Sequence, residues 1–495
     1  MPQRVTQLVP IMKNNYYSHT SQLIPHTISY LVSKSSQMQD LIAALQMMRK
    51  HFNTGTLIPY EYRKQQLTKL KQSVLKYEKE ISEALYTDMK KSAEEAYATE
   101  TGLLLAELNA SIKNLYSWMK PKSVSTNLVN LPSTSKIYRD PLGVVLIIAP
   151  WNYPLQLSLI PLVGAIAGGN CVVVKPSELA PATALIIDKI IGETFSPEYV
   201  KVVLGDGAEI IPAMMTGFRF DHIFYTGSIP VGKSIYQMAA ADLVPVTLEL
   251  GGKSPVIIEK DANIEVACRR IALAKFVNAG QTCIAPDYVL VQNEVKEKFI
   301  SLLKNSISKF FTQDASGSYD YSKIINTKRF DKLVSYLKEG KIVYGGQYNR
   351  ETLFIAPTII EDVSLDGILM NEEIFGPVLP VLGYDSHEEA IAIVHRNPNP
   401  LAFYLFTNSS SIEKEWITKL SFGGGCINNG IWHFANHHLP FGGVGSSGMG
   451  AYHGKFTFET FTRPKSVMKT PAWFDPGIKY PSFKGRMKLF KMLFK

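Results

Sequence analysis

Residues 142–250 alternate short apolar runs with longer amphipathic segments. The apolar runs are rich in Val, Ile and Leu, and they read GVVLIIAP, CVVVK, KVVL, DHIFYTG and VPVTLEL. Runs that are apolar without alternation are typical of parallel strands covered on both faces. The amphipathic segments between them, 181–192, 208–215 and 230–240, fit right-handed crossover helices. The pattern therefore predicts an α/β fold with a doubly wound, dinucleotide-binding type of domain.

A second series of alternating segments follows. SPVIIE at 254–259 and YVLVQ at 288–292 have the composition of buried strands, while residues 263–277 and 294–310 have helical periodicity. A second α/β domain is expected here.

The segments before these two domains differ in composition. Residues 61–120 lack proline, contain no glycine before Gly102, and predict two or three helices. Residues 121–139 are rich in Pro, Ser, Asn and Thr and predict extended arms. Residues 1–37 show no clear period, and an amphipathic pattern begins near Met38. They fit either a targeting segment or an unstructured extension upstream of a start at Met38; the scarcity of arginine favours the extension.

The formal net charge of +9 is unevenly distributed along the chain. Residues 1–37 contribute +3 and residues 463–495 contribute +8, so the chain between them is close to neutral. Proteins that bind nucleic acid more often carry basic residues on a folded face, interleaved with aromatic side chains. No nucleic-acid partner is therefore expected.

The segment KGRMKLFKMLFK at 484–495 has a pattern of its own. Lysines recur at intervals of three and four residues with apolar residues between them. Such a segment fits a terminal helix that docks on the protein or on a partner subunit, or a basic amphipathic helix in weak contact with an anionic membrane surface. Docking is favoured, since one such segment binds a membrane only marginally. No apolar run reaches the roughly 20 residues that span a bilayer, and the expected location is cytoplasmic, with peripheral membrane contact left open.

The four cysteines are Cys171, Cys268, Cys283 and Cys426. They are far apart and form no CxxC pair, which argues against a disulfide framework and against a zinc site. No metal site is predicted, and a reducing compartment is indicated.

Most lone cysteines are small core residues, but Cys283 lies in the polar turn of NAGQTCIAPDY. A thiol there can reach substrate, and nearby backbone N–H groups can favour its thiolate, so Cys283 is the candidate nucleophile.

Glu249 and Asn152 are the candidate partners of Cys283. Glu249 ends the run VPVTLEL and precedes a glycine pair. The carboxyl ends of strands in open α/β sheets face the ligand crevice, where burial can make a carboxylate a general base. Asn152, in APWNYP, follows another strand, and its amide together with the Cys283 N–H would suit an oxyanion. Taken singly, a solvated glutamate and a turn-forming asparagine are the simpler interpretations.

Three further segments have features of a cofactor site. VVVKPSE places Lys175 and Glu178 at a strand end, where a ribose can meet them. TGSIPVG places Gly227 and Ser228 at a helix start, where free N–H groups can hold a pyrophosphate. This is not a GxGxxG fingerprint, which the chain lacks, and alone the signal is weak.

NEEIFGP places Glu373 and Phe375 beside a Gly-Pro turn, where they can hold a nicotinamide ribose and ring. Each motif is modest alone, but together and in this order they closely resemble the aldehyde dehydrogenase superfamily over about residues 38–470. GQTCIAPDY, and the Lys-rich tail after residues 441–461, are most similar to its class 3, fatty-aldehyde-type branch.

The resemblance implies a role for each motif. It implies that Cys283 is the nucleophile, Glu249 the base and Asn152 the oxyanion donor. It assigns three pairs of residues to NAD or NADP. These are Lys175 and Glu178 at the adenosine ribose, Gly227 and Ser228 at the phosphates, and Glu373 and Phe375 at the nicotinamide end. Additional cofactor contacts are implied for Trp151, Tyr225 and Gly207.

The resemblance also implies an NAD(P)-binding domain, a catalytic domain and a β arm that joins subunits into a homodimer. The expected boundaries are 38–120 and 140–248 for the cofactor domain, 249–425 for the catalytic domain, 121–139 and 426–470 for the arm, 1–37 for the extension and 471–495 for the basic tail.

The implied function is oxidation of an aldehyde, medium- or long-chain aliphatic or aromatic, to its carboxylic acid. Glu249 favours hydrolysis of a thioester on Cys283, since relatives that pass the acyl group to coenzyme A usually lack a Glu at this position. A coenzyme A-acylating relative and a catalytically silent binding protein on the same fold remain alternatives. A thiol hydrolase is less favoured, because no histidine in a local motif pairs with Cys283.

Overall fold

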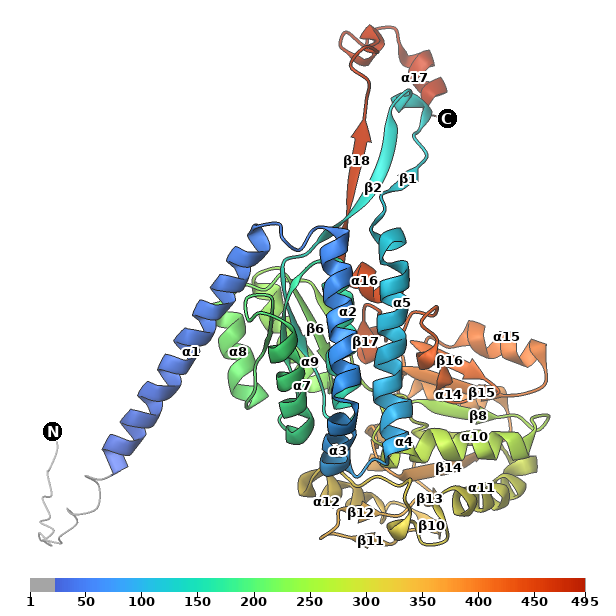
Figure 1. Cartoon of the computed structure of the whole chain (residues 1–495). Helices are drawn as coiled ribbons and strands as arrows, with labels where there is room; N and C mark the ends of the chain where they lie inside the picture. Colours follow the sequence, from blue (N-terminus) through green and yellow to red (C-terminus); the bar gives the residue numbers. More distant parts are fainter. Residues whose placement is uncertain (1–22, 495) are drawn as a thin grey trace, which may run out of the picture.

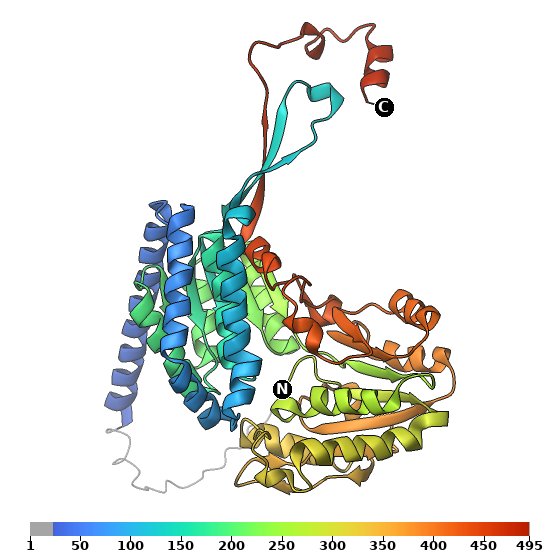
Figure 2. The same cartoon turned by 45° about the vertical axis from the view of Figure 1, so that its right-hand side comes forward.

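The computed structural model describes residues 23–494, and the side chains of residues 37–494. Two sheets with helices on their faces form the body, and a narrow three-stranded arm projects from it (Figure 1). Figure 2 shows the two sheets in separate layered units that meet along one side. The predicted α/β class is confirmed.

The first unit contains a six-stranded sheet of order β17-β7-β6-β3-β4-β5, parallel except for β17. Its strands are β3 (Val144–Ile148), β4 (Cys171–Lys175), β5 (Val200–Val202), β6 (His222–Thr226), β7 (Val246–Glu249) and β17 (Gly448–Met449). Strands β3, β4 and β6 are buried throughout, which explains why their central residues are apolar without alternation. The chain runs from β3 to β5 in one direction and then crosses to β6 and β7 on the other side. The sheet is therefore doubly wound, and its ligand crevice is expected at the carboxyl ends of β3 and β6.

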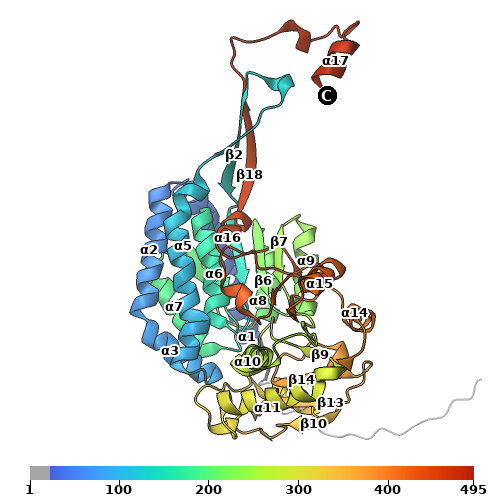
Figure 3. The ribbon, with the colours of Figure 1, turned by 90° about the vertical axis from the view of Figure 1, so that its right-hand side faces the viewer.

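Helices cover both faces of this sheet. In Figure 3, α2, α5 and α6 lie on one side and α9 on the other. Every residue of α6 is buried, because this helix lies between the sheet and the outer helices α2 and α5. The helices of the unit are α2 (Tyr60–Lys76), α3 (Glu78–Met89), α4 (Ala93–Ala96), a π-helical turn (Tyr97–Thr101), α5 (Gly102–Met119), α6 (Pro154–Gly168), α7 (Pro181–Thr194), α8 (Gly207–Gly217) and α9 (Ile229–Ala241).

Helix α1 (Leu23–Asn53) begins well before Met38, where the amphipathic pattern starts. Pro25 does not prevent this, because it falls in the first turn, where a missing N–H breaks no helical hydrogen bond. Leu45 and Met48 are buried where the helix packs against α8, β3 and β4. The predicted unstructured extension 1–37 is therefore wrong for its helical part from Leu23, and residues 1–22 lie outside the described residues.

The second unit contains a seven-stranded sheet of order β10-β13-β14-β9-β8-β15-β16, in which only β10 is antiparallel. Its strands are β10 (Lys341–Tyr344), β13 (Thr358–Glu361), β14 (Val378–Tyr384), β9 (Tyr288–Gln292), β8 (Pro255–Ile258), β15 (Ala402–Phe406) and β16 (Gly424–Ile427), with a separate pair β11 (Tyr348–Asn349) and β12 (Phe354–Ile355). Its helices are α10 (Ile264–Phe276), α11 (Lys296–Phe311), α12 (Thr327–Tyr336), α13 (Ile368–Asn371), α14 (His387–His395) and α15 (Ser410–Lys419).

The arm is an antiparallel sheet of β1 (Lys122–Val124), β2 (Thr134–Pro141) and β18 (Thr462–Lys469), in that order. Figure 1 shows it rising from the first unit, with α17 (Met487–Leu493) near its far end. Seven of the eight residues of β18 are exposed, so the arm has no core of its own. This exposure is expected of a segment that packs against another subunit.

The predicted assignment of residues 426–470 to the arm is wrong for most of this segment. β16 belongs to the second sheet, β17 pairs with β7, and α16 (Lys455–Thr460) packs against α6. Tyr452, Phe458 and Phe461 are buried, and their burial holds this stretch in the body. Only β18 continues into the arm.

Candidate active site

A cavity of about 760 Å³ lies where the two units meet. Residues at the strand ends of the first sheet, including Thr226 and Glu249, line one side. Residues of the second unit, including Cys283 and Leu401, line the other. A concave, mainly apolar cavity with a few polar groups is the usual form of a small-molecule site.

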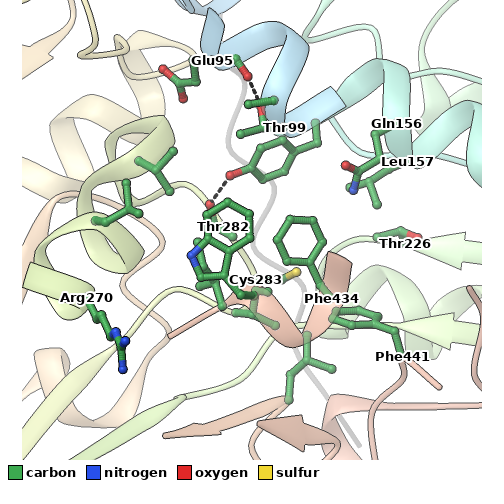
Figure 4. Close-up of a pocket in the computed structure, with 18 of the residues that line it drawn as sticks. Glu95, Thr99, Gln156, Leu157, Thr226, Arg270, Thr282, Cys283, Phe434 and Phe441 are labelled. Carbon is green, nitrogen blue, oxygen red and sulfur yellow. Dashed lines mark hydrogen bonds between the residues drawn. The ribbon is translucent and has the colours of Figure 1, made fainter. Parts of the chain in front are cut away.

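Cys283 reaches this cavity through a tight turn after α10. Asn278, Ala279 and Gly280 all have left-handed backbone angles, with φ of 54°, 50° and 72°. Only glycine fits the third position, because a Cβ there would lie 2.3 Å from the carbonyl oxygen of Gly376. Figure 4 shows the Cys283 sulfur directed into the cavity. The turn thus exposes a thiol to substrate.

Buried polar groups hold this turn in place. The Glu95 carboxylate accepts the Asn278 backbone N–H at 2.9 Å. The Asn278 side-chain amide donates to the carbonyls of Asn152 (2.9 Å) and Gln281 (3.2 Å). These contacts stabilise a conformation that non-glycine residues rarely adopt.

Glu249 ends β7 and is 2% exposed. Both of its carboxylate oxygens are buried and have no hydrogen-bond partner within residues 37–494. Burial raises the pKa of this carboxyl well above its ordinary value. Glu249 is therefore a proton acceptor of increased basicity that faces the same cavity as Cys283.

Burial raises the pKa of the Cys283 thiol to about 12, and the carboxyls of Glu373 and Glu249 act in the same direction. Hydrogen bonds from the backbone N–H groups of Cys283 and Ile284 oppose these effects but are smaller. The expectation that backbone N–H groups favour the thiolate is thus correct in sign, but desolvation outweighs it. At neutral pH the protein without cofactor holds a thiol.

Asn152 follows β3 and is buried against the Cys283 turn. Its Nδ2 donates one N–H to the Gln281 carbonyl at 3.1 Å. An asparagine amide has two N–H groups, so the second is not used in this hydrogen bond. Its side-chain oxygen is buried and without a partner in the described part of the chain. Asn152 does not line the cavity itself, but it is hydrogen-bonded to the turn whose Thr282 and Cys283 do.

A buried pair that the sequence did not predict supports Asn152. The Lys91 ammonium lies 2.5 Å from the Glu100 carboxylate and donates to the Asn152 backbone carbonyl at 3.1 Å. Glu100 also accepts the backbone N–H groups of Leu155 (2.9 Å) and Gln156 (3.3 Å) at the start of α6. The two side chains are nine residues apart across a π-helical turn, a spacing with no recognisable sequence signal.

The expected adenosine end lies at the carboxyl edge of the first sheet. Lys175 ends β4, is 2% exposed, and donates to the Glu178 carboxylate at 2.9 Å. Gly207 begins α8, and a Cβ there would lie 3.6 Å from the same carboxylate. The structure therefore brings Lys175, Glu178 and Gly207 together.

The expected phosphate end is the start of α9. Ser228 occupies the N-cap position but makes no side-chain capping bond, so the first N–H groups of this 13-residue helix remain available for an anion. The Tyr225 hydroxyl donates to the Ser228 carbonyl at 3.3 Å. Gly227 donates its N–H to the Glu249 carbonyl at 3.0 Å, which ties the phosphate end to the candidate base.

The expected nicotinamide end joins both units. The rings of Trp151 and Phe375 meet edge to face with centroids 5.4 Å apart. Glu373 packs so closely on Gly251 that a Cβ there would lie 2.0 Å from its carboxylate. Burial, followed by the charge of Asp287, raises the pKa of Glu373 to about 8. Three features of this edge fit a bound dinucleotide. They are the uncapped start of α9, the close contacts at Gly207 and Gly251, and the Trp151–Phe375 pair.

Comparison with known proteins decides the family. The family model described as "Aldehyde dehydrogenase family" matches residues 21–467. The chain belongs to the aldehyde dehydrogenase family. It is 47% identical to 4,4′-diaponeurosporen-aldehyde dehydrogenase of Staphylococcus aureus, over 90% of this chain and 97% of the relative. The dimeric NADP-preferring aldehyde dehydrogenase of Canis lupus familiaris is 41% identical over 91% of this chain and 99% of that relative.

The solved structures agree. The substrate-bound structure of Staphylococcus aureus AldH superposes with a TM-score of 0.90 at 46% identity, covering 92% of this chain and 99% of that one. The expectation of an aldehyde dehydrogenase that resembles class 3 is confirmed. The roles of individual site residues in this enzyme stay predictions.

Proposed function

We propose that this enzyme oxidises apolar aldehydes to carboxylic acids through a thioester on Cys283, which water activated by Glu249 hydrolyses. One observation carries the proposal: Cys283 and Glu249, from the two different units, face one cavity. NAD or NADP is the expected cofactor, since a relative is named as NADP-preferring and solved relatives are described with NADP and with NAD⁺.

The cofactor would be held by the residues brought together above. Lys175, Glu178 and Gly207 would hold the adenosine ribose, and Gly227 and Ser228 the diphosphate. When bound, the nicotinamide accepts the hydride from the substrate carbon. Its ring and ribose would be positioned by Trp151, Phe375 and Glu373, with Tyr225 supporting the phosphate turn.

The chemistry assigned to the protein has two halves. The Cys283 thiol gives up its proton to water, its sulfur bonds to the aldehyde carbon, and the free Asn152 N–H together with the Cys283 backbone N–H stabilises the resulting oxyanion. After hydride loss the substrate is an acyl thioester. Glu249 then takes a proton from water, the water oxygen bonds to the acyl carbon, and the carbon–sulfur bond breaks to release the acid. The raised pKa of Glu249 suits this proton transfer.

The cavity supports an apolar substrate of medium or long chain, or an aromatic one. Its lining includes Leu157, Leu273, Phe310, Ile431, Phe434 and Phe441. Its volume of about 760 Å³ lies within the range of small-molecule sites. An initial-rate panel of aliphatic aldehydes from three to sixteen carbons, and of aromatic aldehydes, tests this with NAD and with NADP. We expect kcat/KM to rise with chain length; a preference for short polar aldehydes would contradict the proposal.

Acyl transfer to coenzyme A is the alternative reaction on this fold. Glu249 favours hydrolysis, because it is buried beside the cavity where the thioester would form. The enzyme should therefore release free acid at the same rate with and without coenzyme A. Dependence of turnover on coenzyme A, with acyl-coenzyme A as product, would reject hydrolysis.

A homodimer formed through the arm is supported by the relative named as dimeric. Within residues 23–494, β1 and β18 each have one sheet neighbour, so one edge of each remains open for pairing. Deletion of residues 121–139 would shift the mass measured by light scattering from dimer to monomer if the arm carries the interface. An unchanged dimer mass would place the interface elsewhere.

The tail supports a second, weaker proposal: a cytoplasmic enzyme in peripheral contact with an anionic membrane. Helix α17 leaves Met487, Met492 and Phe494 exposed, with Lys488 and Lys491 on the same short helix. Within residues 23–494 no helix combines the length and the hydropathy required to cross a bilayer, so the contact would be superficial. Sedimentation with phosphatidylglycerol vesicles should weaken when residues 484–495 are removed. Equal binding by both forms would reject the contact.

A further inference from the structure

A small cavity with a few polar groups in its lining adjoins the substrate cavity. Gln156, Phe434 and His453 line both and form the wall between them. The second cavity, here called the annex, has a volume of about 20 Å³, and Glu107 and His437 are among its other lining residues. A cavity of that volume can hold one water when polar groups surround it.

Two residues of the wall carry acceptor atoms without a partner. Gln156 Oε1 and His453 Nε2 are buried and have no partner in the described chain. Each residue is 5% exposed. The other His453 nitrogen forms a hydrogen bond with the backbone of Phe434. Burial lowers the pKa of the ring to about 3, so at neutral pH the ring is uncharged and Nε2 carries a free lone pair. Unpaired buried acceptors are costly, and a water that donates to both would satisfy them.

Glu107 lies on the far side of the annex. Its carboxylate accepts the Gly454 N–H at 2.8 Å and the Thr457 hydroxyl at 3.4 Å. Burial raises the pKa of Glu107 to about 7, so it exchanges protons readily at neutral pH. Ala106 is exposed and His437 is partly exposed, which brings this side of the annex close to solvent.

The annex is also electrostatically connected to the catalytic groups. Burial raises the pKa of Tyr452, and the charges of Glu249, Cys283 and Glu107 raise it further. Tyr452 immediately precedes His453 and lines the substrate cavity. The carboxyl groups of Glu249 and Glu107 therefore both raise the pKa of the same buried side chain.

The reaction makes a second route necessary. Aldehyde, water and oxidised cofactor give carboxylate, reduced cofactor and two protons. The proton that Glu249 takes from water must leave the site before the next turnover. A long apolar chain in the substrate cavity excludes water from that route, because the lining there is mainly apolar.

We propose that the annex is the proton exit of this enzyme, in which a water held by Gln156 and His453 passes the proton from the hydrolytic step to Glu107 and then to solvent. The water accepts the incoming proton on its oxygen, turns one O–H from the Gln156 oxygen to the Glu107 carboxylate, and that O–H bond breaks as the proton passes to Glu107. After Glu107 has released the proton to solvent, the water and the groups that hold it are unchanged. This inference rests on the proposed function, because Glu249 must be the base.

The test compares Gln156→Leu and His453→Asn with the unmodified enzyme. Asparagine suits position 453, where φ is +82°. Stopped-flow absorbance of reduced cofactor reports acylation, and a pH indicator reports proton release. With dodecanal we expect a normal burst, while proton release and steady-state turnover slow by at least about tenfold, the lower end of general acid–base effects. With propanal, which leaves the cavity open to water, both variants should stay within about twofold of the unmodified enzyme.

The matched control is His433→Asn. His433 also has a buried, unpartnered Nε2, but it lines neither cavity, and its replacement should leave both rates unchanged. Glu107→Gln, which keeps an acceptor for the Gly454 N–H, should also slow proton release with dodecanal. Normal proton release with dodecanal, or the same loss with both aldehydes, overturns the proton exit. Failure of Glu249→Gln to stall after the burst would instead overturn the proposed base.

Discussion

Glu249 and Cys283 face one cavity although they come from the two different units of the protein. Glu249 ends β7 of the six-stranded sheet, and Cys283 lies in the loop before β9 of the seven-stranded sheet. The geometry of the reaction thus depends on how the two units meet, and changes to either residue should affect separate half-reactions.

Replacement of the candidate nucleophile should abolish acylation. We expect Cys283→Ser to lose at least about 10³-fold in steady-state turnover, because a serine hydroxyl without an activating base is a poor nucleophile. Cofactor affinity, measured by fluorescence of the reduced form, should be unchanged. Cys426→Ser is the matched control, since Cys426 does not line the cavity; a similar loss there would remove the special role of Cys283.

Replacement of the candidate base should separate the two halves of the reaction. Glu249→Gln is nearly isosteric and should still give a burst of reduced cofactor, followed by turnover slowed by about 10²–10⁴-fold. Mass spectrometry of the intact protein should detect the acyl group on Cys283. Steady-state turnover equal to that of the unmodified enzyme would show that another group activates water.

The reactivity of Cys283 without cofactor should rise with pH. Because its pKa is raised to about 12, only a small fraction is thiolate at neutral pH. Below that pKa, the rate of alkylation by iodoacetamide should increase about tenfold per pH unit, since only the thiolate reacts. Cys283→Ala gives the background from the other cysteines. A plateau below pH 8 would mean that the thiol ionises far more easily than its burial implies.

Glu178 should determine the preference between the two cofactors. Its carboxylate is 42% exposed and is held by Lys175, where it would accept a hydrogen bond from a free ribose hydroxyl and repel a phosphate. Glu178→Gln should improve the affinity for NADP relative to NAD by roughly tenfold, which corresponds to 1.4 kcal/mol. Asp188→Asn, an exposed carboxylate change on α7, should leave the ratio unchanged. Equal ratios in both variants would place the discrimination elsewhere.

The buried pair of Lys91 and Glu100 should contribute to stability as well as to the site. Both side chains are fully buried, so Lys91→Met leaves the Glu100 carboxyl without its partner. We expect a loss of about 3–5 kcal/mol in the free energy of unfolding, measured in urea. Lys189→Met removes an exposed partner of Glu80, and its effect on the free energy of unfolding should be much smaller, because solvent screens exposed ion pairs. Equal losses would show that burial of the pair is unimportant.

Local patterns predicted much of the fold. Strands β3, β4 and β6 are buried on both faces, so their central residues had to be apolar, and the crossover helices had to be amphipathic. Patterns failed where tertiary contacts decide. Residues 426–461 read like part of the arm, but Tyr452, Phe458 and Phe461 bury against the body.

The sequence by itself determined the alternation of strands and helices over residues 142–310, the family, and the candidate residues for the chemistry, because each depends on local composition or on short motifs. The tertiary structure alone decided that burial outweighs the backbone N–H groups at Cys283, that Glu95 holds the Cys283 turn and Lys91 holds Asn152, and that Gln156 and His453 line both cavities. The physical reason is that desolvation and hydrogen bonding depend on which distant segments surround a group, and no spacing along the chain records that.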